Sequence, residues 1–290
     1  RKNKKIRVEN SIFLFIINLL LSVRKITLLL LLCAIIQLAF ITASDPNHIS
    51  TPNTIAVAVE TTTAPQDFIT VEQDFDNHLD EVYYDSQLHL SGLNKEVFRL
   101  GMIGYYNLLN KQKIKRSDLL TIVDYDQAST KERLFVIDLD NHGLVHHSLV
   151  AHGQKTGGNY AKYFSNKSES HQSSLGFYAT AETYEGKYGY SLRLDGFDAG
   201  FNCKARDRAI VMHGADYVSR DFIARQGRLG RSWGCLSLQR QEAPTVISKI
   251  RNGSCIYVHK NDSNFQSKSN WLNESKAVDY WASQQMAANF

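Results

Sequence analysis

The sequence predicts a β-rich α+β domain, with mixed sheets or a sandwich and a few helices. Short segments rich in β-branched and aromatic residues recur between turn residues. Helical periodicity is confined to the ends of this region and to one segment within it, so strands and helices do not alternate as in a doubly wound sheet. The 290 residues, 43% hydrophobic and 21% charged, suffice for one domain with a sizeable core and extra segments.

The first 44 residues are set apart by two apolar runs, 11–23 and 26–43, on either side of the basic pair Arg24-Lys25. The second run ends in small residues before Asp45-Pro46, as a secretory signal does. Its length also approaches that of a membrane anchor. We expect residues 1–44 to be a leader, acting as a signal peptide or a membrane anchor, and the rest to be exported to the periplasm or cell envelope.

Positive charge is concentrated in this leader. Residues 1–44 contain seven Lys or Arg and one Glu, a net charge of +6, whereas the whole chain carries +4. The remaining part is therefore −2, and the basic balance of the chain gives no support to nucleic-acid binding.

Residues 45–90 are rich in Thr, Asp, Asn and Gln and lack sustained periodicity, which predicts a polar linker. The main domain is expected at 91–260. It opens with apolar residues at helical spacing, which predict a helix over 93–110 with Ser91 as a possible cap.

Seven segments after this helix have the composition of strands, and Asn141-His142-Gly143 predicts a hairpin turn between the second and third. A second helix is expected over 240–251. Residues 261–290 form a C-terminal tail, in which Trp271, Val278 and Trp281 at helical intervals predict a helix packed on the domain. The predicted strands are 119–123, 133–139, 144–151, 175–180, 188–194, 209–212 and 255–259.

The candidate chemistry is concentrated in residues 209–238. An apolar run leads to His213, and a glycine-rich loop then leads to Cys235. An adjacent imidazole can convert a thiol into a thiolate nucleophile near neutral pH. Gly230 and Gly234 would allow tight turns and present backbone N–H groups to an oxyanion. The same spacing also fits a buried cysteine in a glycine loop and a hydrogen-bonded core histidine.

Two stretches resemble the catalytic motif of the murein L,D-transpeptidases of the YkuD type, in which a His-Gly at a strand end precedes a Ser-x-Gly-Cys loop. Similar segments at 150–153, 164–166, 173–178 and 189–194 extend the resemblance over roughly residues 90–260. The two stretches are His213-Gly214-Ala215-Asp216-Tyr217 and Gly230-Arg231-Ser232-Trp233-Gly234-Cys235.

The resemblance implies an L,D-transpeptidase-like catalytic domain with Cys235 as nucleophile and His213 as base. The carbonyl of Gly214 is expected to orient the histidine, with Ser232 positioning the loop and Gly234 serving the oxyanion. Two positions depart from the family pattern. Trp233 replaces a histidine common in the wider family, and Leu236-Ser237 replaces a Pro-Ala common in the nearer branch, which puts the loop geometry in question.

Arg231 is expected to bind carboxylates of a peptide stem by forked hydrogen bonds, although dispersed arginines are also typical of a solvated loop face. Asp216 is interpreted as structural. The other candidate substrate-binding residues are Trp233, Tyr217, His152 and His171.

No metal site is predicted, because His146 and His147 would face opposite sides of a strand and no Cys or carboxylate has ligand-like spacing to the histidines of this segment. The implied mechanism requires neither a metal nor an organic cofactor. Cys203 and Cys255 could form a disulfide or remain two buried thiols.

By the resemblance, the Cys235 thiolate attacks a peptidoglycan stem tetrapeptide at its third residue, and an amine from a neighbouring stem resolves the thioester. Water as the acceptor would instead give an L,D-carboxypeptidase or endopeptidase, and a degenerate site would leave a wall-binding module. A papain-like protease is disfavoured, because there the cysteine precedes the histidine in the chain.

Overall fold

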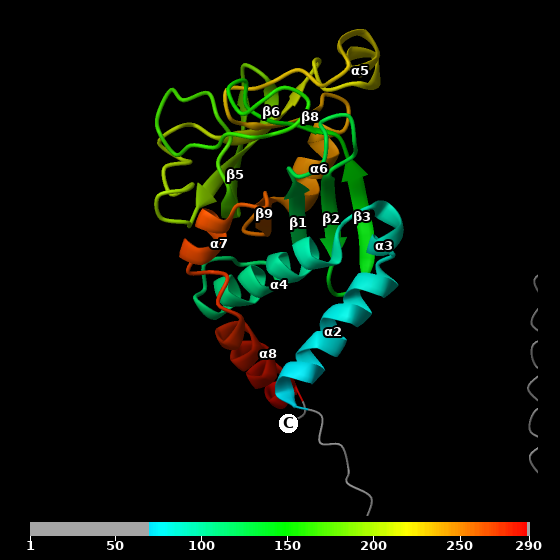
Figure 1. Cartoon of the computed structure of the whole chain (residues 1–290), viewed down its shortest axis with the longest axis vertical. Helices are drawn as coiled ribbons and strands as arrows, with labels where there is room; N and C mark the ends of the chain where they lie inside the picture. The colour runs from blue at the N-terminus through cyan, green and yellow to red at the C-terminus, as the bar shows by residue number, and fades with distance from the viewer. Residues whose placement is uncertain (1–69, 289–290) are drawn as a thin grey trace, which may run out of the picture. The chain divides into compact units, whose positions relative to one another are not determined.

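The computed structural model describes residues 70–288. The prediction of an α+β fold is confirmed: these residues form seven helices and nine strands, and the strands join into one mixed sheet (Figure 1). The leader at 1–44 and the first part of the predicted linker, 45–69, lie outside the described residues.

The sheet has the order β3-β2-β1-β9-β5-β6-β7-β8-β4, in which β1 pairs with β9, and β7 with β8, in parallel. All seven predicted strand segments are present, and the predicted turn at 141–143 joins β2 to β3. The strand β8, next to the glycine-rich loop, was not predicted. The strands are β1 (Leu119–Asp124), β2 (Leu134–Asp138), β3 (Gly143–Ser148), β4 (Val150–Ala151), β5 (Gly176–Gly186), β6 (Gly189–Gly196), β7 (Val211–Ala215), β8 (Leu236–Gln239) and β9 (Cys255–His259).

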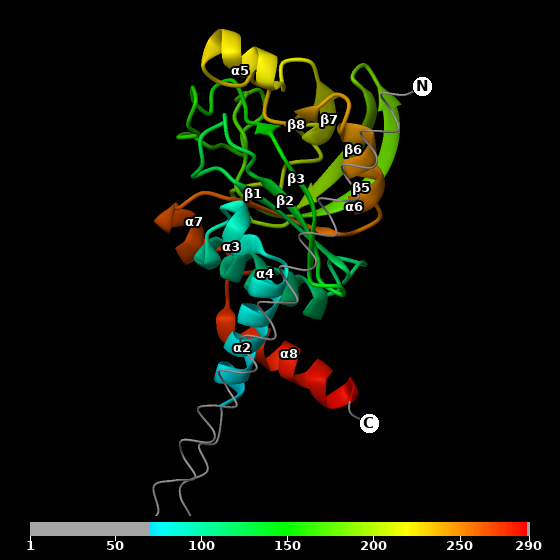
Figure 2. The same cartoon turned by 90° about the vertical axis from the view of Figure 1, so that its right-hand side faces the viewer.

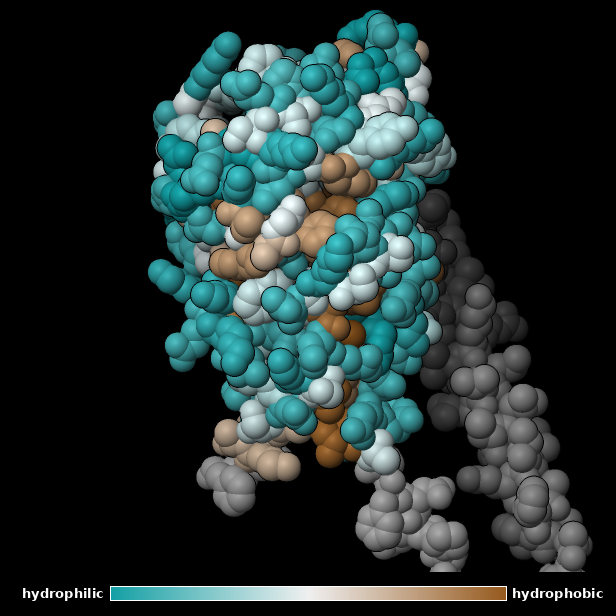
Figure 3. Space-filling view, turned by 60° about the vertical axis from the view of Figure 1, so that its left-hand side comes forward, coloured by the Kyte–Doolittle hydropathy of each residue, from teal (hydrophilic) through white to brown (hydrophobic). Residues whose placement is uncertain are grey.

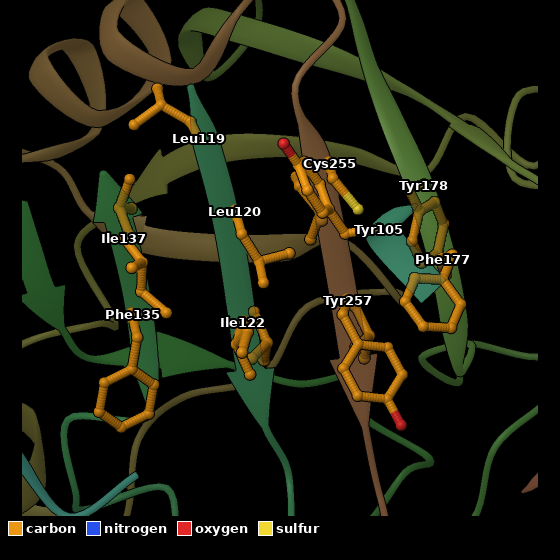
Figure 4. Packing of buried hydrophobic residues seen from close by; sticks show 14 of the residues in the cluster. Tyr105, Leu119, Leu120, Ile122, Phe135, Ile137, Phe177, Tyr178, Cys255 and Tyr257 are labelled. Carbon is orange, nitrogen blue, oxygen red and sulfur yellow. The ribbon is translucent and has the colours of Figure 1, made fainter. Parts of the chain in front are cut away.

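The predicted opening helix is α4 (Lys95–Asn110), which packs against β1 and β9 (Figures 1 and 2). Its cap is Asn94 and not Ser91, since the Asn94 side chain accepts hydrogen bonds from the first turn. Figure 4 shows apolar side chains of β1, β9 and β5 lying side by side in the core that this helix covers, among them Ile122, Tyr257 and Phe177.

The interpretation of residues 45–90 as a polar linker is wrong from Val71 onward. Residues there form α2 (Val71–Asp85), capped by Thr70, and the short α3 (Leu88–Ser91). Phe75, Leu79 and Val82 are buried on one face of α2. The polar residues between them occupy the exposed face of an amphipathic helix, which explains why the segment reads as a linker by composition.

The predicted helical tail is confirmed and consists of two helices, α7 (Ser263–Lys268) and α8 (Glu274–Ala288). α8 packs on α2 and α4, with Trp281 at an edge-to-face angle to Phe75 at a ring distance of 5.6 Å. The first and last helices of the described chain therefore belong to one layer.

None of the helices within residues 70–288 combines the length and the apolar character needed to cross a bilayer. The space-filling view shows mostly hydrophilic residues, with apolar residues reaching the surface in a few separate places (Figure 3).

The helix predicted near 240–251 is α6 (Ala243–Ile250), which contacts β6 and β7. A further short helix, α5 (Arg220–Gln226), was not predicted. A small apolar cluster supports the loop that leads to Cys235. It packs this loop against the ends of β3, β4 and β7. The cluster consists of Leu149, Ala151, Ala215, Val218 and Leu229.

Candidate active site

The two candidate catalytic residues lie on neighbouring parallel strands. β7 carries His213, and Cys235 directly precedes β8. In the register of this pair His213 is opposite Ser237, and alternate residues of a strand share a face. Ser237 therefore points to the same face as His213, and Cys235 lies two residues before Ser237, at the bend that leads into β8.

The His213 ring is held at both nitrogens. Nδ1 lies 3.0 Å from the carbonyl oxygen of Gly214, the contact that the resemblance implies. Because a carbonyl only accepts, Nδ1 carries the proton, and Nε2 of the neutral ring is an acceptor. Burial lowers the pKa of His213, while the bond to the Gly214 carbonyl acts in the opposite direction. The exposed ring of Tyr188 stacks on the imidazole at 4.6 Å.

Ser237 is the hydrogen-bond partner of Nε2 of this imidazole. Its hydroxyl lies 3.1 Å from His213 Nε2 and donates to it, and the hydroxyl of Tyr217, 2.9 Å away, donates to Ser237. Ser237 is fully buried. One of the two residues that depart from the family pattern therefore touches the proposed base, and the half-buried Tyr217 reaches the site through Ser237.

The Cys235 thiol donates a hydrogen bond to the carbonyl oxygen of Ala209, 3.7 Å away, and none of its hydrogen bonds within residues 70–288 goes to the His213 ring. Burial raises the pKa of this thiol, whereas the Val211 backbone amide and the Arg208 guanidinium act to lower it. The structure thus holds both members of the pair in their neutral forms.

The glycine-rich loop makes the tight turn that its sequence predicts, but the backbone N–H of Gly234 already forms a hydrogen bond within the loop. Gly234 has φ +118°, a conformation that favours glycine. Its N–H donates to Ser232 Oγ at 3.0 Å, and the same hydroxyl donates to the Cys235 carbonyl at 2.7 Å. Ser232 therefore braces the nucleophile loop from within, while a role of Gly234 toward an oxyanion stays a prediction.

Two of the expected substrate contacts lie at the rim of the site. Trp233 is 71% exposed and stacks on His171 at a ring distance of 4.7 Å. The partly exposed Arg231 donates to the backbone carbonyls of Gln154 and Gly157. Arg231 therefore stabilises the neighbouring loop, and its proposed contact with a stem carboxylate stays a prediction.

The expectation that His152 lines the substrate cleft is wrong. The ring is 1% exposed, and its Nδ1 accepts from the buried Arg133 guanidinium at 2.9 Å. Burial, together with the charge of Arg133, lowers the pKa of His152 to about 3. His152 is thus a neutral core residue that joins the loop after β4 to a buried cation.

Asp216 is structural, as interpreted, since it forms a surface ion pair with Arg240. His146 and His147 face opposite sides of β3: His147 stacks on Phe135, and His146 lies 3.5 Å from Glu242.

Two groups within residues 70–288 contain carboxylates and a histidine close enough to share a metal ion, and neither includes Cys235 or His213. In the second, the Asp126 carboxylate is already paired with His259 and Lys260. The groups are Glu81, Asp85 and His142, and Asp124, Asp126 and His259.

The remaining cysteines of the described chain are free thiols in different surroundings. Cys203 is exposed, and its sulfur lies 3.3 Å from the amide nitrogen of Asn166. Cys255 is fully buried in β9, and burial raises the pKa of its thiol. Of the two alternatives left open by the sequence, the structure has the unpaired thiols, although only one of them is buried.

A cleft opens beside the Cys235 loop. Gln172 lines it, and the Gln172 carbonyl oxygen lies 2.7 Å from the position that a Cβ would take on Gly234. Three lysines without an ion-pair partner in the described part of the chain line the cleft together with one carboxylate, that of Asp262, which gives its wall a net positive charge. They are Lys162, Lys167 and Lys204.

Arg208 and Tyr188 were not predicted as site residues. Tyr188 lies at the tip of the β5–β6 hairpin and reaches His213 only through the fold. Arg208 precedes β7 by three residues, but its partners come from 165–174. No local pattern in the sequence gives these long-range contacts.

Comparisons with known proteins give a family for this chain. The sequence matches the family described as L,D-transpeptidase catalytic domain over residues 89–259. No curated protein matches the chain. An L,D-transpeptidase structure from Mycobacterium smegmatis is 14% identical over 49% of this chain and 59% of that one, with a TM-score of 0.32.

Two other similar structures are also L,D-transpeptidases. L,D-transpeptidase 3 from Mycobacterium tuberculosis, in complex with a faropenem-derived adduct, is 12% identical over 49% of this chain and 60% of that one, with a TM-score of 0.32. The protein from Xylanimonas cellulosilytica is 14% identical over 50% and 63%, with a TM-score of 0.30.

The present chain thus spans less than two thirds of the length of each of these relatives. The family match itself extends over more than half of the 290 residues and includes both His213 and Cys235. The chain belongs to the family of L,D-transpeptidase catalytic domains.

Proposed function

We propose that this protein is an exported, cysteine-dependent peptidoglycan L,D-transpeptidase. Family membership supports the enzyme class. One observation carries the cysteine chemistry: Cys235 directly precedes β8, the strand that pairs in parallel with the strand of His213, and the histidine is oriented by the Gly214 carbonyl. The apolar leader at 1–44 supports export to the periplasm or cell envelope, either as a free protein or held by a membrane anchor.

The reaction has two steps, both at the carbonyl of the third residue of a stem tetrapeptide. In the first, Cys235 Sγ bonds to the carbonyl carbon and gives its proton to His213. The C–N bond to the terminal D-residue breaks, and the amine leaves with that proton. In the second, an amine of a neighbouring stem attacks the thioester, the S–C bond breaks, and the thiol is restored. The product is a direct cross-link.

For the first step, His213 Nε2 has to accept the Cys235 proton, so the Ser237 hydroxyl must release that nitrogen. Hydrogen bonds of catalytic groups are often formed only in the complex with substrate. Cys235 and Ser237 flank Leu236 in the sequence, so the thiol that would take the place of the Ser237 hydroxyl belongs to the same short segment.

Water in place of the amine would give an L,D-carboxypeptidase or endopeptidase from the same thioester. The cleft beside Gln172, with three lysines, would favour the transferase if it binds an acceptor stem through its free carboxylates, whereas a donor stem there would serve both reactions. A wall-binding module without catalysis would require an unreactive thiol at Cys235.

The test is incubation of the full chain with disaccharide tetrapeptides, followed by mass spectrometry of the products. Cross-linked dimers are expected from the wild type. In Cys235→Ala the rate should fall on the order of 10³-fold or more, since the nucleophile is lost. Shortened monomers alone would assign the hydrolase, and equal product from Cys235→Ala would refute the cysteine mechanism. A thiol probe that leaves Cys235 unlabelled would favour the wall-binding module.

A further inference from the structure

Both members of the candidate pair are held uncharged by their surroundings. Burial raises the pKa of the Cys235 thiol and lowers the pKa of the His213 imidazole. Moving the proton from one to the other creates two charges in a desolvated site, which is unfavourable without compensation. A fixed positive charge beside the sulfur would supply that compensation.

Arg208 is a half-buried guanidinium held in one position. Nη1 donates to the Ser165 carbonyl at 2.6 Å and to Ser174 Oγ, and Nη2 donates to the Gln172 carbonyl at 2.7 Å and to Ser170 Oγ at 3.0 Å. All four acceptors are neutral. In contrast to the paired arginines of this fold, such as Arg206, Arg208 forms no ion pair with a carboxylate of residues 70–288.

This guanidinium lies against the nucleophile loop. Its Nη2 is 3.4 Å from the position that a Cβ would take on Gly234, the residue before Cys235. The residue after Arg208 is Ala209, whose carbonyl accepts the hydrogen bond of the Cys235 thiol. Burial lowers the pKa of Arg208 and raises that of Cys235, and against this the charge of each residue favours the charged form of the other.

The other titratable groups facing Cys235 do not supply a permanent charge. His213 on β7 is the partner that takes the proton. Tyr217 and Tyr125 interact with the thiolate, but burial raises the pKa of both phenols, that of Tyr125 to about 12. Both are therefore neutral near neutral pH, whereas an arginine stays charged.

We propose that Arg208 is a positioning residue that stabilises the Cys235 thiolate and fixes the segment 165–174 beside the nucleophile. The inference rests on the proposed role of Cys235 as nucleophile. Its test, however, measures the thiol itself and needs no peptidoglycan, so a protein without transferase activity would still give a definite answer.

The test is the rate of alkylation of Cys235 by iodoacetamide between pH 5 and pH 10 in the full chain, with the Cys235 peptide quantified by mass spectrometry. Following that peptide separates it from the exposed Cys203. Arg208→Gln is expected to raise the midpoint of the profile by about one pH unit and to slow alkylation at pH 7 about tenfold. Arg208→Lys keeps the charge and should stay close to the wild type.

Two variants control for structure. Arg206→Gln removes an exposed arginine two residues away whose partners are Glu182 and Asp195, and it should leave the profile unchanged. Ser170→Ala removes one of the bonds that hold the Arg208 side chain without removing charge, and it should shift the midpoint much less than Arg208→Gln.

An unchanged midpoint in Arg208→Gln would overturn the proposal, and so would an equal shift in Ser170→Ala, since the effect would then be structural. If Arg208→Gln does not fold, Arg208→Lys decides. It loses most of the hydrogen bonds but keeps the charge, so a midpoint near the wild type supports the proposal and a midpoint raised by a full unit refutes it.

Discussion

Ser237 controls the lone pair that the proposed base would use. Its hydroxyl donates to His213 Nε2, and such a bond favours the neutral ring over the protonated one. The serine stands at one of the positions where the sequence departs from the expected family pattern, and its hydroxyl forms this hydrogen bond in the present chain. Before substrate binds, Nε2 of the proposed base His213 is therefore already hydrogen-bonded to Ser237.

Ser237→Ala is expected to raise the pKa of His213 by up to about one unit, because one hydrogen bond to the neutral ring, worth about 1 kcal/mol, is lost. The titration of the His213 ring by NMR measures this shift directly. The matched control is Ser191→Ala on the other side of the same histidine. Ser191 is buried and opposite His213 in the ladder with β6, but its hydroxyl donates to the Gly189 carbonyl. Equal titration curves for the two variants would contradict the prediction.

His152 should make the stability of the fold depend on pH. Its pKa is about 3 in the folded chain and about 6.5 when unfolded, so below pH 6.5 the unfolded state binds more protons. Stability is therefore lost as the pH falls from about 6.5 to about 3, by up to about 1.4 kcal/mol per pH unit.

The buried Asp198 acts in the opposite direction, because burial raises its pKa to about 6 and stability then falls as the pH rises toward that value. The comparison of wild type with His152→Gln by urea unfolding at pH 4, 5 and 6 separates the two, since Asp198 is present in both. The wild type should lose more stability toward pH 4 than the variant. Parallel curves would show that His152 does not titrate as described.

At the scale of elements, α4 and the strands other than β8 follow from local patterns, while α2 does not. The residues buried in α2 do have helical spacing, Phe75 to Leu79 to Val82. Only the packing of this stripe on α4 and α8 distinguishes it from a polar tether, and that contact is long-range. The same holds within the site: His213 and Cys235 are found by motif, but the roles of His152 and Arg208 depend on partners elsewhere in the chain.

The contact between α4 and β5 depends on a glycine. A Cβ on Gly104 would lie 2.0 Å from the ring of Phe177, which is fully buried and has no room to move. Gly104→Ala should therefore destabilise the fold by about 2 kcal/mol or more through overpacking. Chemical unfolding measures the loss.

Gly101→Ala in the same helix is the control. There a Cβ would lie 3.0 Å from the end of the flexible Ile122 side chain, and the better helix propensity of alanine, about 1 kcal/mol, offsets the crowding. A Gly104→Ala variant as stable as Gly101→Ala would show that the Phe177 ring can move to make room for the methyl group.

At the scale of the molecule, the first and last helices of the described chain pack against each other. α2 and α8 meet beside α4, and Trp281 contacts both Phe75 and His78. The family match stops at residue 259, before α7 and α8, and begins after α2. The layer formed by α2 and α8 is thus an addition to the matched domain.

Trp281→Ala is expected to cost about 3 kcal/mol of unfolding free energy, because a large buried ring is removed. The double-mutant cycle with Phe75→Ala should give a coupling of about 0.5–1.5 kcal/mol from the edge-to-face contact. Met286→Ala, at an exposed position of the same helix, should change stability by less than about 0.5 kcal/mol. A coupling near zero would mean that the two helices fold independently of each other.

The layer of α2 and α8 lies at the end of the domain away from the nucleophile loop. The start of α2 and the end of α8 lie below the sheet in both views, whereas β8 lies near the opposite end (Figures 1 and 2). The described chain therefore enters the domain at the end away from Cys235, which directly precedes β8. A label or surface linkage placed at the start of α2 would leave the nucleophile loop uncovered.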